Sequence, residues 1–437
     1  MYDYKYEPHR VIFMIDNKSF FASCEALRLG KNPMKVCLAV MSRPKNSSWG
    51  SGLIMAASPL AKKKYGLHNV MRARELPSHT PDLMIVSPHM NLYIKRSMQV
   101  LDIFREYAAD EDIHMYSIDE GMIDMTNSWK LFGNDPYYVA HKMQKEIHDK
   151  LGLYTTCGIG ENPLLAKLAM DIEAKHNKSM IAYWHYIDVP DKIWQIPNLE
   201  DVWGINTRTA SHLRKIGINN MYELAHTNPA VLKREFGIIG EQLFAESWGV
   251  DRSIISHKYQ PKAKSYGNSQ VLPHDYFEQD EIEVVIRELG EQVAARIRAH
   301  NLRTGCVGLY IGFSFDEICY QDHRSGFSIQ HKITPTNVNH DLVQYLLAIF
   351  RENWQGEAVR NIGVNYSMLS PDDSMQLNFL ENTELQIKRY KLDHVVDKIR
   401  KKYGFSALVK ASSLKTGATA IERSNLVGGH NGGNAYE

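Results

Sequence analysis

Apolar and polar positions alternate in blocks along the first 185 residues, and these blocks predict strands and helices in turn. Short continuous apolar runs have the length of buried strands, and apolar residues at helical spacing predict amphipathic helices. Strands are expected at 11–15, 36–41 and 54–57, and helices are expected around 93–104, 135–151 and 162–172. The last two helices carry start signals, because Asp135 and Asn162 are each followed by a proline. The pattern predicts an α+β core with helices packed on a sheet.

The pattern changes twice further along the chain. Residues 190–257 read as helical, and the basic segment 258–264 reads as a tether. A second mixed unit follows, with a helix expected at 282–299 and strands expected at 307–315, 327–333 and 362–369. In a final helix Leu392, Val395, Val396, Ile399 and Tyr403 share a face opposite basic residues, and we expect core packing there before DNA or partner binding. A chain of 437 residues is long enough for two to four such domains.

The amino-acid composition excludes fewer classes of function than the pattern of apolar and polar residues does. The net charge of +1 means that any contact with nucleic acid has to come from local clusters of Lys and Arg. The five cysteines include no close pair, and the histidines show no zinc-finger or metalloprotease spacing, so we expect reduced thiols in the cytoplasm. The sequence shows no basic leader with an apolar stretch and no run long enough for a membrane span.

Two acidic motifs carry the candidate chemistry. Asp119 and Glu120 are adjacent in the segment Ser117–Gly121, with strand expected at 116–118 and at 122–125, while Asp16 ends the apolar run at 11–15. If the two segments are neighbouring strands, three carboxylates converge, and they repel one another unless a divalent cation lies among them. This arrangement predicts Mg²⁺ and phosphoryl transfer. The alternative is that these residues only cap helices or occupy turns.

Several segments together resemble one known family. Asp16-Asn-Lys-Ser-Phe-Phe-Ala-Ser-Cys-Glu25 and Ser117-Ile-Asp-Glu-Gly121 look like the two metal-binding motifs of the Y-family translesion DNA polymerases, closest to the bacterial SOS-induced, error-prone (UmuC-like) branch. Further matches follow in family order at 57–59, 157–163 and 202–205, so the resemblance covers nearly the whole chain.

The resemblance implies an α+β multidomain fold. Its parts are a palm with a ferredoxin-like mixed sheet, small fingers, a helical thumb with a helix-hairpin-helix, and an α+β little finger. The implied ranges are 1–30 and 76–189 for the palm, 31–75 for the fingers, 190–257 for the thumb, 258–380 for the little finger and 381–437 for a C-terminal helical tail.

By the same resemblance, Asp16, Asp119 and Glu120 are catalytic and bind two Mg²⁺ ions, for which Mn²⁺ is a substitute. The backbone carbonyl of Asn17 completes one metal site. Two metal ions about 3.5 to 4 Å apart stabilise both the attacking and the leaving oxygen of an in-line displacement, here from a deoxynucleoside triphosphate to a primer 3′-hydroxyl. The implied activity is that of an error-prone, DNA-directed DNA polymerase in DNA damage tolerance and SOS mutagenesis.

The nucleotide site is also implied by the resemblance. Phe21 matches the steric gate that excludes ribonucleotides, and Phe20 beside it packs into the core; from sequence alone both read as core aromatics. Lys62 and Lys175 match lysines that grip the triphosphate, with Lys63 and Lys64 as rivals to the first, although each also reads as a solvated surface lysine. The predicted nucleotide-binding residues are Phe20, Phe21, Ser58, Lys62 and Lys175.

DNA contacts are expected from the thumb hairpin and from scattered basic residues, whose binding is independent of sequence and sensitive to salt. An ordinary helical hairpin is the alternative for the thumb. The candidates are Gly204, Ile205, Asn206, Lys262, Lys264, Arg298, Arg303, Arg324 and Lys332. Gln376-Leu377-Asn-Phe379-Leu380 resembles the peptide with which these polymerases dock on the sliding clamp, or else forms a buried strand end.

The expected partners are primer–template DNA, deoxynucleotides, the β sliding clamp, and an accessory SOS subunit or a recombinase filament, with no membrane and with a location at the nucleoid. Two alternative functions stay open, of which the first is disfavoured by the presence of all three carboxylates and the second uses the same metal chemistry. One is a DNA-binding damage-response factor that works through partner contacts, and the other is a nucleotide cyclase on a related palm-like core. The cyclase does not explain the helical hairpin, the second mixed unit or the clamp-like peptide.

Overall fold

The computed structural model describes residues 2–43, 52–261, 263–315, 325–373, 377 and 381–432. Contacts divide the chain into two compact units, one built on residues 2–42 and 53–259 and the other on residues 260–432. The division lies between Tyr259 and Gln260, next to the boundary expected at 257/258. Within the described part of the chain, no helix has both the length and the apolar content needed to cross a membrane.

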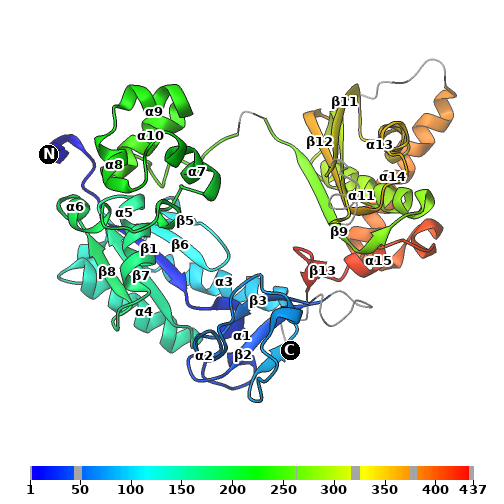
Figure 1. The fold of residues 1–437 in the computed structure, drawn as a ribbon. Helices are drawn as coiled ribbons and strands as arrows, with labels where there is room; N and C mark the ends of the chain where they lie inside the picture. The colour runs from blue at the N-terminus through cyan, green and yellow to red at the C-terminus, as the bar shows by residue number, and fades with distance from the viewer. Residues whose placement is uncertain are drawn as a thin grey trace. The chain divides into compact units, whose positions relative to one another are not determined.

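The first unit is built around a five-stranded mixed sheet with the strand order β5-β6-β1-β7-β8 (Figure 1). The central strand β1 (Ile12–Asn17) pairs antiparallel with β6 (Glu120–Asp124) and with β7 (Thr155–Gly160). The edge strand β5 (Ile113–Met115) pairs antiparallel with β6, and β8 (Ile181–Trp184) pairs parallel with β7. The α+β core expected from the sequence is therefore confirmed.

One face of this sheet is covered by a helix that approaches the backbone of β7. Here α5 (Pro163–Leu168) continues into a π-helical turn, Ala169–Ala174. A Cβ atom at Gly158 would lie 2.0 Å from the carbonyl oxygen of Ala166, so only glycine allows this packing. The start signal expected for α5 is confirmed, because the Asn162 side chain accepts a hydrogen bond from the Leu165 N–H.

Two longer helices pack on each other, and one of them lies on the sheet. α3 (Met90–Phe104) packs against α4 (Pro136–Leu151), and α4 lies against β7 and β8. α4 begins as expected, since Asp135 caps it by accepting from the Tyr138 N–H. Alternate residues of β1 point to opposite faces, and both Phe13 and Met14 are fully buried, so the sheet is covered on both sides.

A small three-stranded sheet follows the first helix of the chain. Its central strand β2 (Leu38–Ser42) pairs antiparallel with β3 (Leu53–Ala57) and parallel with β4 (Met84–Val86). α1 (Phe20–Arg28), which leaves the end of β1, packs against β2 and β3, and α2 (Pro59–Tyr65) follows β3. This small sheet includes β4, which lies beyond residue 75, where the sequence placed the end of the fingers.

Short helices complete the first unit. Their core is continuous with the core around α5 and β8, because Leu165, Trp184 and Leu243 belong to one buried cluster. These helices are α6 (Val189–Lys192), α7 (Thr207–Lys215), α8 (Met221–His226), α9 (Pro229–Phe236) and α10 (Ile238–Ser247).

The second unit is an antiparallel four-stranded sheet with helices on one face. The strand order is β11-β10-β12-β9. α11 (Gln279–Ala299) and α13 (Asn339–Asn353) pack on each other and on this sheet. The strands are β9 (Tyr266–Tyr276), β10 (Leu302–Phe313), β11 (Gly326–Thr336) and β12 (Val359–Pro371).

The C-terminal segment docks on the helical side of this second unit. α14 (Thr383–Tyr403) lies against α11 and α13, and α15 (Ala420–Arg423) lies against α11. A short hairpin of β13 (Leu426–Val427) and β14 (His430–Asn431) follows. The core packing expected for the apolar stripe of α14 is wrong, because Leu392 and Val395 are 57% and 51% exposed while Asp393 is buried. Polar contacts hold this helix instead.

Candidate functional site

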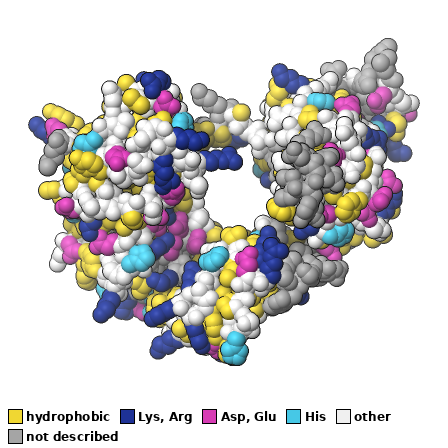
Figure 2. Space-filling model, viewed as in Figure 1, with side chains coloured by type: hydrophobic (Ala, Val, Ile, Leu, Met, Phe, Trp, Pro, Cys, Tyr) yellow, Lys and Arg dark blue, Asp and Glu magenta, His cyan; other side chains and the backbone are white. Residues whose placement is uncertain are grey.

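Two carboxylates face each other where β1 and β6 lie side by side, and a third precedes one of them along the chain. Asp16 and Glu120 face each other across the antiparallel ladder, so their side chains lie on the same face of the sheet. Asp119 immediately precedes Glu120 in the turn between β5 and β6. Figure 2 shows acidic side chains gathered in this part of the first unit, bordered by Lys and Arg. The strand expected at 116–118 is wrong, since β5 ends at Met115 and the turn begins there.

Backbone and hydroxyl contacts tie the two acidic motifs together. The backbone N–H and the side-chain amide of Asn17 donate to the carbonyl oxygen of Asp119 at 2.9 Å and 3.0 Å. The Ser117 hydroxyl donates to Asp119 Oδ1 at 2.6 Å and accepts from the Glu120 N–H at 3.1 Å. These contacts hold Asp119 and Glu120 beside β1.

Two lysines from the opposing helix reach the carboxylates. Lys167 Nζ lies 2.8 Å from Glu120 Oε1 and 3.2 Å from Asp171 Oδ2. Lys175 Nζ lies 3.3 Å from Asp16 Oδ2 and 2.8 Å from Asp171 Oδ1. The sequence interpretation missed Lys167 and Asp171. Their four-residue spacing, typical of helical ion pairs, was the available signal.

The charges of the cluster shift its pKa values. Burial raises the pKa of Asp16 to about 6, with Glu120 and Asp119 adding to the rise and Lys175 opposing it. Burial would lower the pKa of Lys175, but the Asp16 and Asp171 carboxylates outweigh it and raise this pKa to about 12. The site therefore holds more negative charge than its surroundings readily accommodate.

The donor set fits a hard divalent cation. Among the described residues, no three His, Cys, Asp or Glu side chains stand in a ready metal-binding group, and lysine ammonium groups contact the Glu120 and Asp16 carboxylates. Carboxylate and carbonyl oxygens are nevertheless the ligands that Mg²⁺ and Mn²⁺ prefer. The buried Asn17 Oδ1 also has no hydrogen-bond partner within the described part of the chain.

The two phenylalanines at the start of α1 lie in different environments. Phe20 is 2% exposed in the core, and Phe21 is only partly buried. The Phe21 ring stacks on Tyr93 of α3, with ring centroids 4.5 Å apart and an interplanar angle of 17°. The Phe21 ring is therefore packed on one face against Tyr93.

The side chains of Ser58, Lys62 and Lys64, which follow β3, lie in different environments. Ser58 is buried, donates to the Val36 carbonyl at 2.7 Å and accepts from the Ala61 N–H at the start of α2. The expectation that Ser58 binds nucleotide is therefore wrong, because its hydroxyl is committed to the fold. Lys64 pairs with Asp82 at 2.8 Å. Burial lowers the pKa of Lys62, and the charge of Asp16 opposes this shift.

The helical part of the first unit contains two tight interhelical turns. Before α7, Gly204 has a φ of +94° and Asn206 caps the helix by accepting from the Thr209 N–H at 2.9 Å. Ile205 is buried, so this turn offers backbone groups rather than apolar side chains. The α9–α10 turn was missed. Its signal was the glycine pair Gly237 and Gly240, and a Cβ atom at Gly240 would lie 2.0 Å from the Leu232 carbonyl oxygen.

The second unit leaves one face of its sheet without helices. Small and polar residues of all four strands line a shallow hollow of about 450 Å³ on this face. They include Gly267, Ser269, Gly308, Ser328, Gly363 and Asn365. Such a surface lets another molecule approach the backbone closely. The sequence interpretation missed it because it considered only basic residues.

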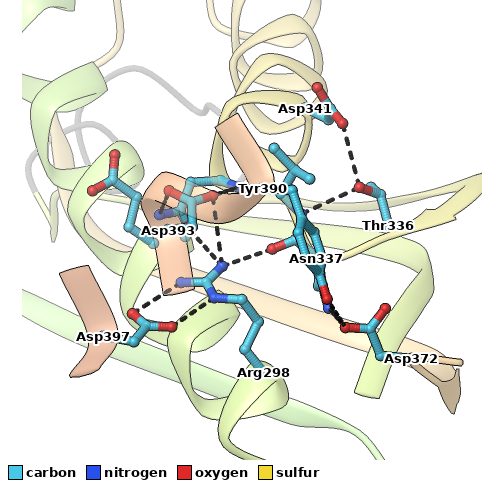
Figure 3. Close-up of polar contacts among 12 residues, drawn as sticks. Arg298, Thr336, Asn337, Asp341, Asp372, Tyr390, Asp393 and Asp397 are labelled. Carbon is cyan, nitrogen blue, oxygen red and sulfur yellow. Dashed lines mark hydrogen bonds and ion pairs between the residues drawn. The ribbon is translucent and has the colours of Figure 1, made fainter. Parts of the chain in front are cut away.

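One predicted DNA contact is wrong and another is largely enclosed. Arg298 is 4% exposed, and its guanidinium binds both oxygens of Asp397 and the carbonyl of Asn337 (Figure 3). It cannot reach a phosphate, because α14 covers it. Arg303 pairs with Asp373. Lys264 and Lys332 are exposed. Lys262, Arg324, Gln376, Phe379 and Leu380 lie outside the described residues, and of the clamp-like peptide the structure describes only Leu377.

The site and its surroundings define a class of protein. A mixed sheet presents paired carboxylates at the neighbouring ends of β1 and β6, lysines border them, and tight helical turns belong to the same unit. These are the features of a palm that transfers nucleotidyl groups on nucleic acid.

Comparison with known proteins agrees with this class. Residues 15–171 match the model of the impB/mucB/samB family, and residues 263–379 match that of the impB/mucB/samB family C-terminal domain. The putative UV-damage repair protein UvrX of Bacillus subtilis is 37% identical over 98% of this chain and 100% of its own length. DNA polymerase IV 2 of the same organism is 35% identical over 96% of this chain and 98% of its own length.

A solved structure matches the fold. The Y-family DNA polymerase chimera Dbh-Dpo4(243-245)-Dbh has a TM-score of 0.66 at 20% identity, over 82% of this chain and 98% of that chain. The chain therefore belongs to the impB/mucB/samB family and is a Y-family DNA polymerase, a metal-dependent nucleotidyltransferase. This membership removes the nucleotide cyclase from the alternatives.

Proposed function

We propose that this enzyme extends primers on damaged template DNA by two-metal nucleotidyl transfer at Asp16, Asp119 and Glu120. The observation that carries the proposal is the pairing of Asp16 with Glu120 across β1 and β6, with Lys175 beside Asp16. A strand end with several carboxylates and a nearby lysine suits a nucleotide triphosphate with its cations.

Each residue has a distinct task in this proposal. Asp16, Asp119 and Glu120, with the backbone carbonyl of Asn17, hold the metals. Two Mg²⁺ ions held there, or Mn²⁺ in their place, would supply Lewis-acid activation of the primer 3′-hydroxyl and charge neutralisation on the departing pyrophosphate. Lys175 exchanges its contact with Asp16 for a contact with the triphosphate, and Lys62 binds the triphosphate as well. Phe21 faces C2′ of the incoming sugar to exclude ribonucleotides.

DNA is held without reading its sequence. Backbone N–H groups at the turns before α7 and α10 suit phosphate oxygens, as helix N-termini generally do. Lys264 and Lys332, with the open sheet face of the second unit, add contacts to the duplex. We expect the affinity to fall steeply with salt.

Partners follow from the same function. The segment 376–380 is proposed to dock on the β sliding clamp, and an accessory SOS subunit or a recombinase filament is proposed to regulate access to the primer. The enzyme would work in the cytoplasm at the nucleoid, where its DNA substrate lies.

Primer extension tests the proposal. Purified full-length chain should extend a primer with Mg²⁺ and deoxynucleotides, including past an abasic site. Asp119→Ala should abolish extension while DNA binding persists. Asp102→Ala is the matched control, since this carboxylate is exposed on α3. Extension by the Asp119→Ala variant at the wild-type rate would refute the site.

A further inference from the structure

A fully buried carboxylate lies behind the partly exposed ring of Phe21. Glu25 belongs to α1 and is 0% exposed. Tyr93 donates its hydroxyl to Glu25 Oε1 at 2.6 Å, His89 Nδ1 lies 2.9 Å from the same oxygen, and Arg28 Nε donates to Oε2 at 2.8 Å. Both oxygens of this carboxylate are therefore engaged by neighbouring side chains.

Stability alone is a weak reason for such a network. Taking a carboxylate out of water is costly, and well-packed apolar residues commonly replace buried ion pairs without loss of stability. The effect of the network is better judged by what it holds in place. Of the three groups on Glu25, Tyr93 touches the proposed nucleotide site, because its ring stacks on Phe21.

The stacked ring of Tyr93 limits how far the ring of Phe21 can move. The two rings are nearly parallel, with an interplanar angle of 17° and centroids 4.5 Å apart, and Tyr93 is fully buried. A ring that excludes a ligand by contact must resist displacement when an extra hydroxyl pushes on it. Phe21 cannot retreat unless Tyr93 also moves, and Tyr93 cannot move without breaking its hydrogen bond to Glu25.

The protonation states favour one direction for that hydrogen bond. Burial and the Glu25 carboxylate raise the pKa of Tyr93, so the phenol stays neutral and donates. Arg28 engages the second carboxylate oxygen and limits rotation of the acceptor. The phenol ring is therefore held at its hydroxyl end as well as by packing around its faces.

We propose that Glu25 is a positioning residue for sugar selection, which fixes Tyr93 so that Tyr93 holds Phe21 against C2′ of the incoming nucleotide. The proposal rests on the assignment of Phe21 as the steric gate. It adds a specificity-determining residue that touches neither nucleotide nor metal and acts through two aromatic rings.

Two variants test the proposal in the full-length protein. Tyr93→Phe removes the hydroxyl and leaves the stacked ring, and Glu25→Gln keeps the shape but places an amide against a donor. The readout is kcat/KM for insertion of a deoxynucleotide divided by that for the matching ribonucleotide. We expect this ratio to fall about tenfold in both variants, chiefly through faster ribonucleotide insertion, because small misplacements of a positioning group have effects of this size.

A matched control exists in the same unit. Tyr107 is 3% exposed and donates its hydroxyl to Glu146 Oε2 at 2.6 Å. Tyr107→Phe removes the same chemical group from an equally short contact with no stacking on Phe21. It should lower the melting temperature about as much as Tyr93→Phe does and leave the sugar ratio unchanged.

The outcomes are separable. An unchanged sugar ratio in Tyr93→Phe and Glu25→Gln, with a loss of ratio in Phe21→Ala, would overturn the role of Glu25 and keep the gate. An unchanged ratio in Phe21→Ala itself would overturn the gate assignment and the role of Glu25 with it. A fall in ratio in Tyr107→Phe would show that lost stability, not positioning, sets the ratio, which also overturns the inference.

Discussion

Each unit contains a cluster of acidic side chains held by basic ones, and the two clusters are built differently. In the first unit, Lys167 pairs with Glu120 and Lys175 pairs with Asp16. The neighbouring amide oxygen of Asn17 has no hydrogen-bond partner within the described residues. In the second unit, Arg298 binds Asp397 through two parallel contacts of 2.7 Å and 3.2 Å and donates to Asn337 and Asn339 as well (Figure 3).

The difference shows that ion pairs can be built so that a substrate can replace them or so that they stay closed. A guanidinium presents donors in a planar fork that matches a carboxylate, and a buried fork with every nitrogen engaged is costly to break. An ammonium is a point charge on a flexible stem and gives up one oxygen for another readily. The lysine cluster is therefore suited to a substrate with its own charges, and the arginine cluster is suited to fastening α14.

The largest expected effect is a loss of primer extension when a carboxylate of the first cluster is removed. Asp16→Asn should slow primer extension about a thousandfold, because a lost metal ligand forfeits several kcal/mol of charge stabilisation in the transition state. Single-turnover insertion measures this rate. A variant that keeps more than a tenth of the wild-type rate would contradict the role of Asp16.

Thermal unfolding of the same variant without metal is the control. Because the folded-state pKa of Asp16 is raised to about 6, its ionised form costs stability, and that cost appears as the pH rises through about 6. Asp16→Asn should therefore melt no lower than the wild type at pH 8. A clearly lower melting temperature there would mean that the substitution damages the fold.

The next effect breaks the second cluster. Arg298→Met should destabilise the second unit by about 3 kcal/mol, because it leaves the Asp397 carboxylate without its guanidinium partner. Denaturant unfolding measures this loss. Arg351→Met is the control, since Arg351 makes a similar fork to Glu283 but is 51% exposed, and its removal should cost about 1 kcal/mol or less. Equal losses in the two variants would remove the distinction between a buried and an exposed fork.

A smaller effect sharpens the role of the lysines. Lys175→Met should raise KM for the deoxynucleotide about tenfold with a lesser change in kcat, because it removes one charge-assisted hydrogen bond to the triphosphate. Steady-state insertion kinetics at saturating DNA separate the two constants. A fall in kcat alone would assign Lys175 to the chemical step instead.

The smallest effect concerns the exposed cations of the second unit. Lys332→Ala should lower the slope of log affinity against log salt by about one, because it removes one phosphate contact. Arg303→Ala should leave the slope unchanged, since Arg303 already pairs with Asp373. DNA-binding titrations at several salt concentrations measure both, and equal slopes in all three proteins would remove Lys332 from the interface.

Much of the first unit was predictable because its signals are local. The run at 11–15 became β1, and Asp135 and Asn162 cap the helices that they were expected to start. The pairing of the two acidic motifs was also correct, with β1 and β6 as neighbours. Ser58 was misassigned because its motif position matched, while its hydroxyl is used by Val36 and Ala61.

The errors in the second unit have one physical cause. Arg298 read as a free cation and Leu392 read as core, and the structure reverses the two, with the arginine buried and the leucine exposed. The spacing of apolar residues identifies one face of a helix. Which face packs against the rest of the protein depends on the residues that the neighbouring elements present. Here Arg298 on α11 and Asn339 on α13 supply partners for Asp393 and Asp397.

By itself, the sequence determined the strands, the helix starts and the two acidic motifs, because periodicity and capping act over a few residues. Only the tertiary structure decided which charges are available. It placed Lys167 on Glu120, hid Arg298 beneath α14 and set Glu25 behind the stacked rings of Tyr93 and Phe21. The reason is that burial and pairing, which control the energy of a charge, depend on residues that are distant along the chain.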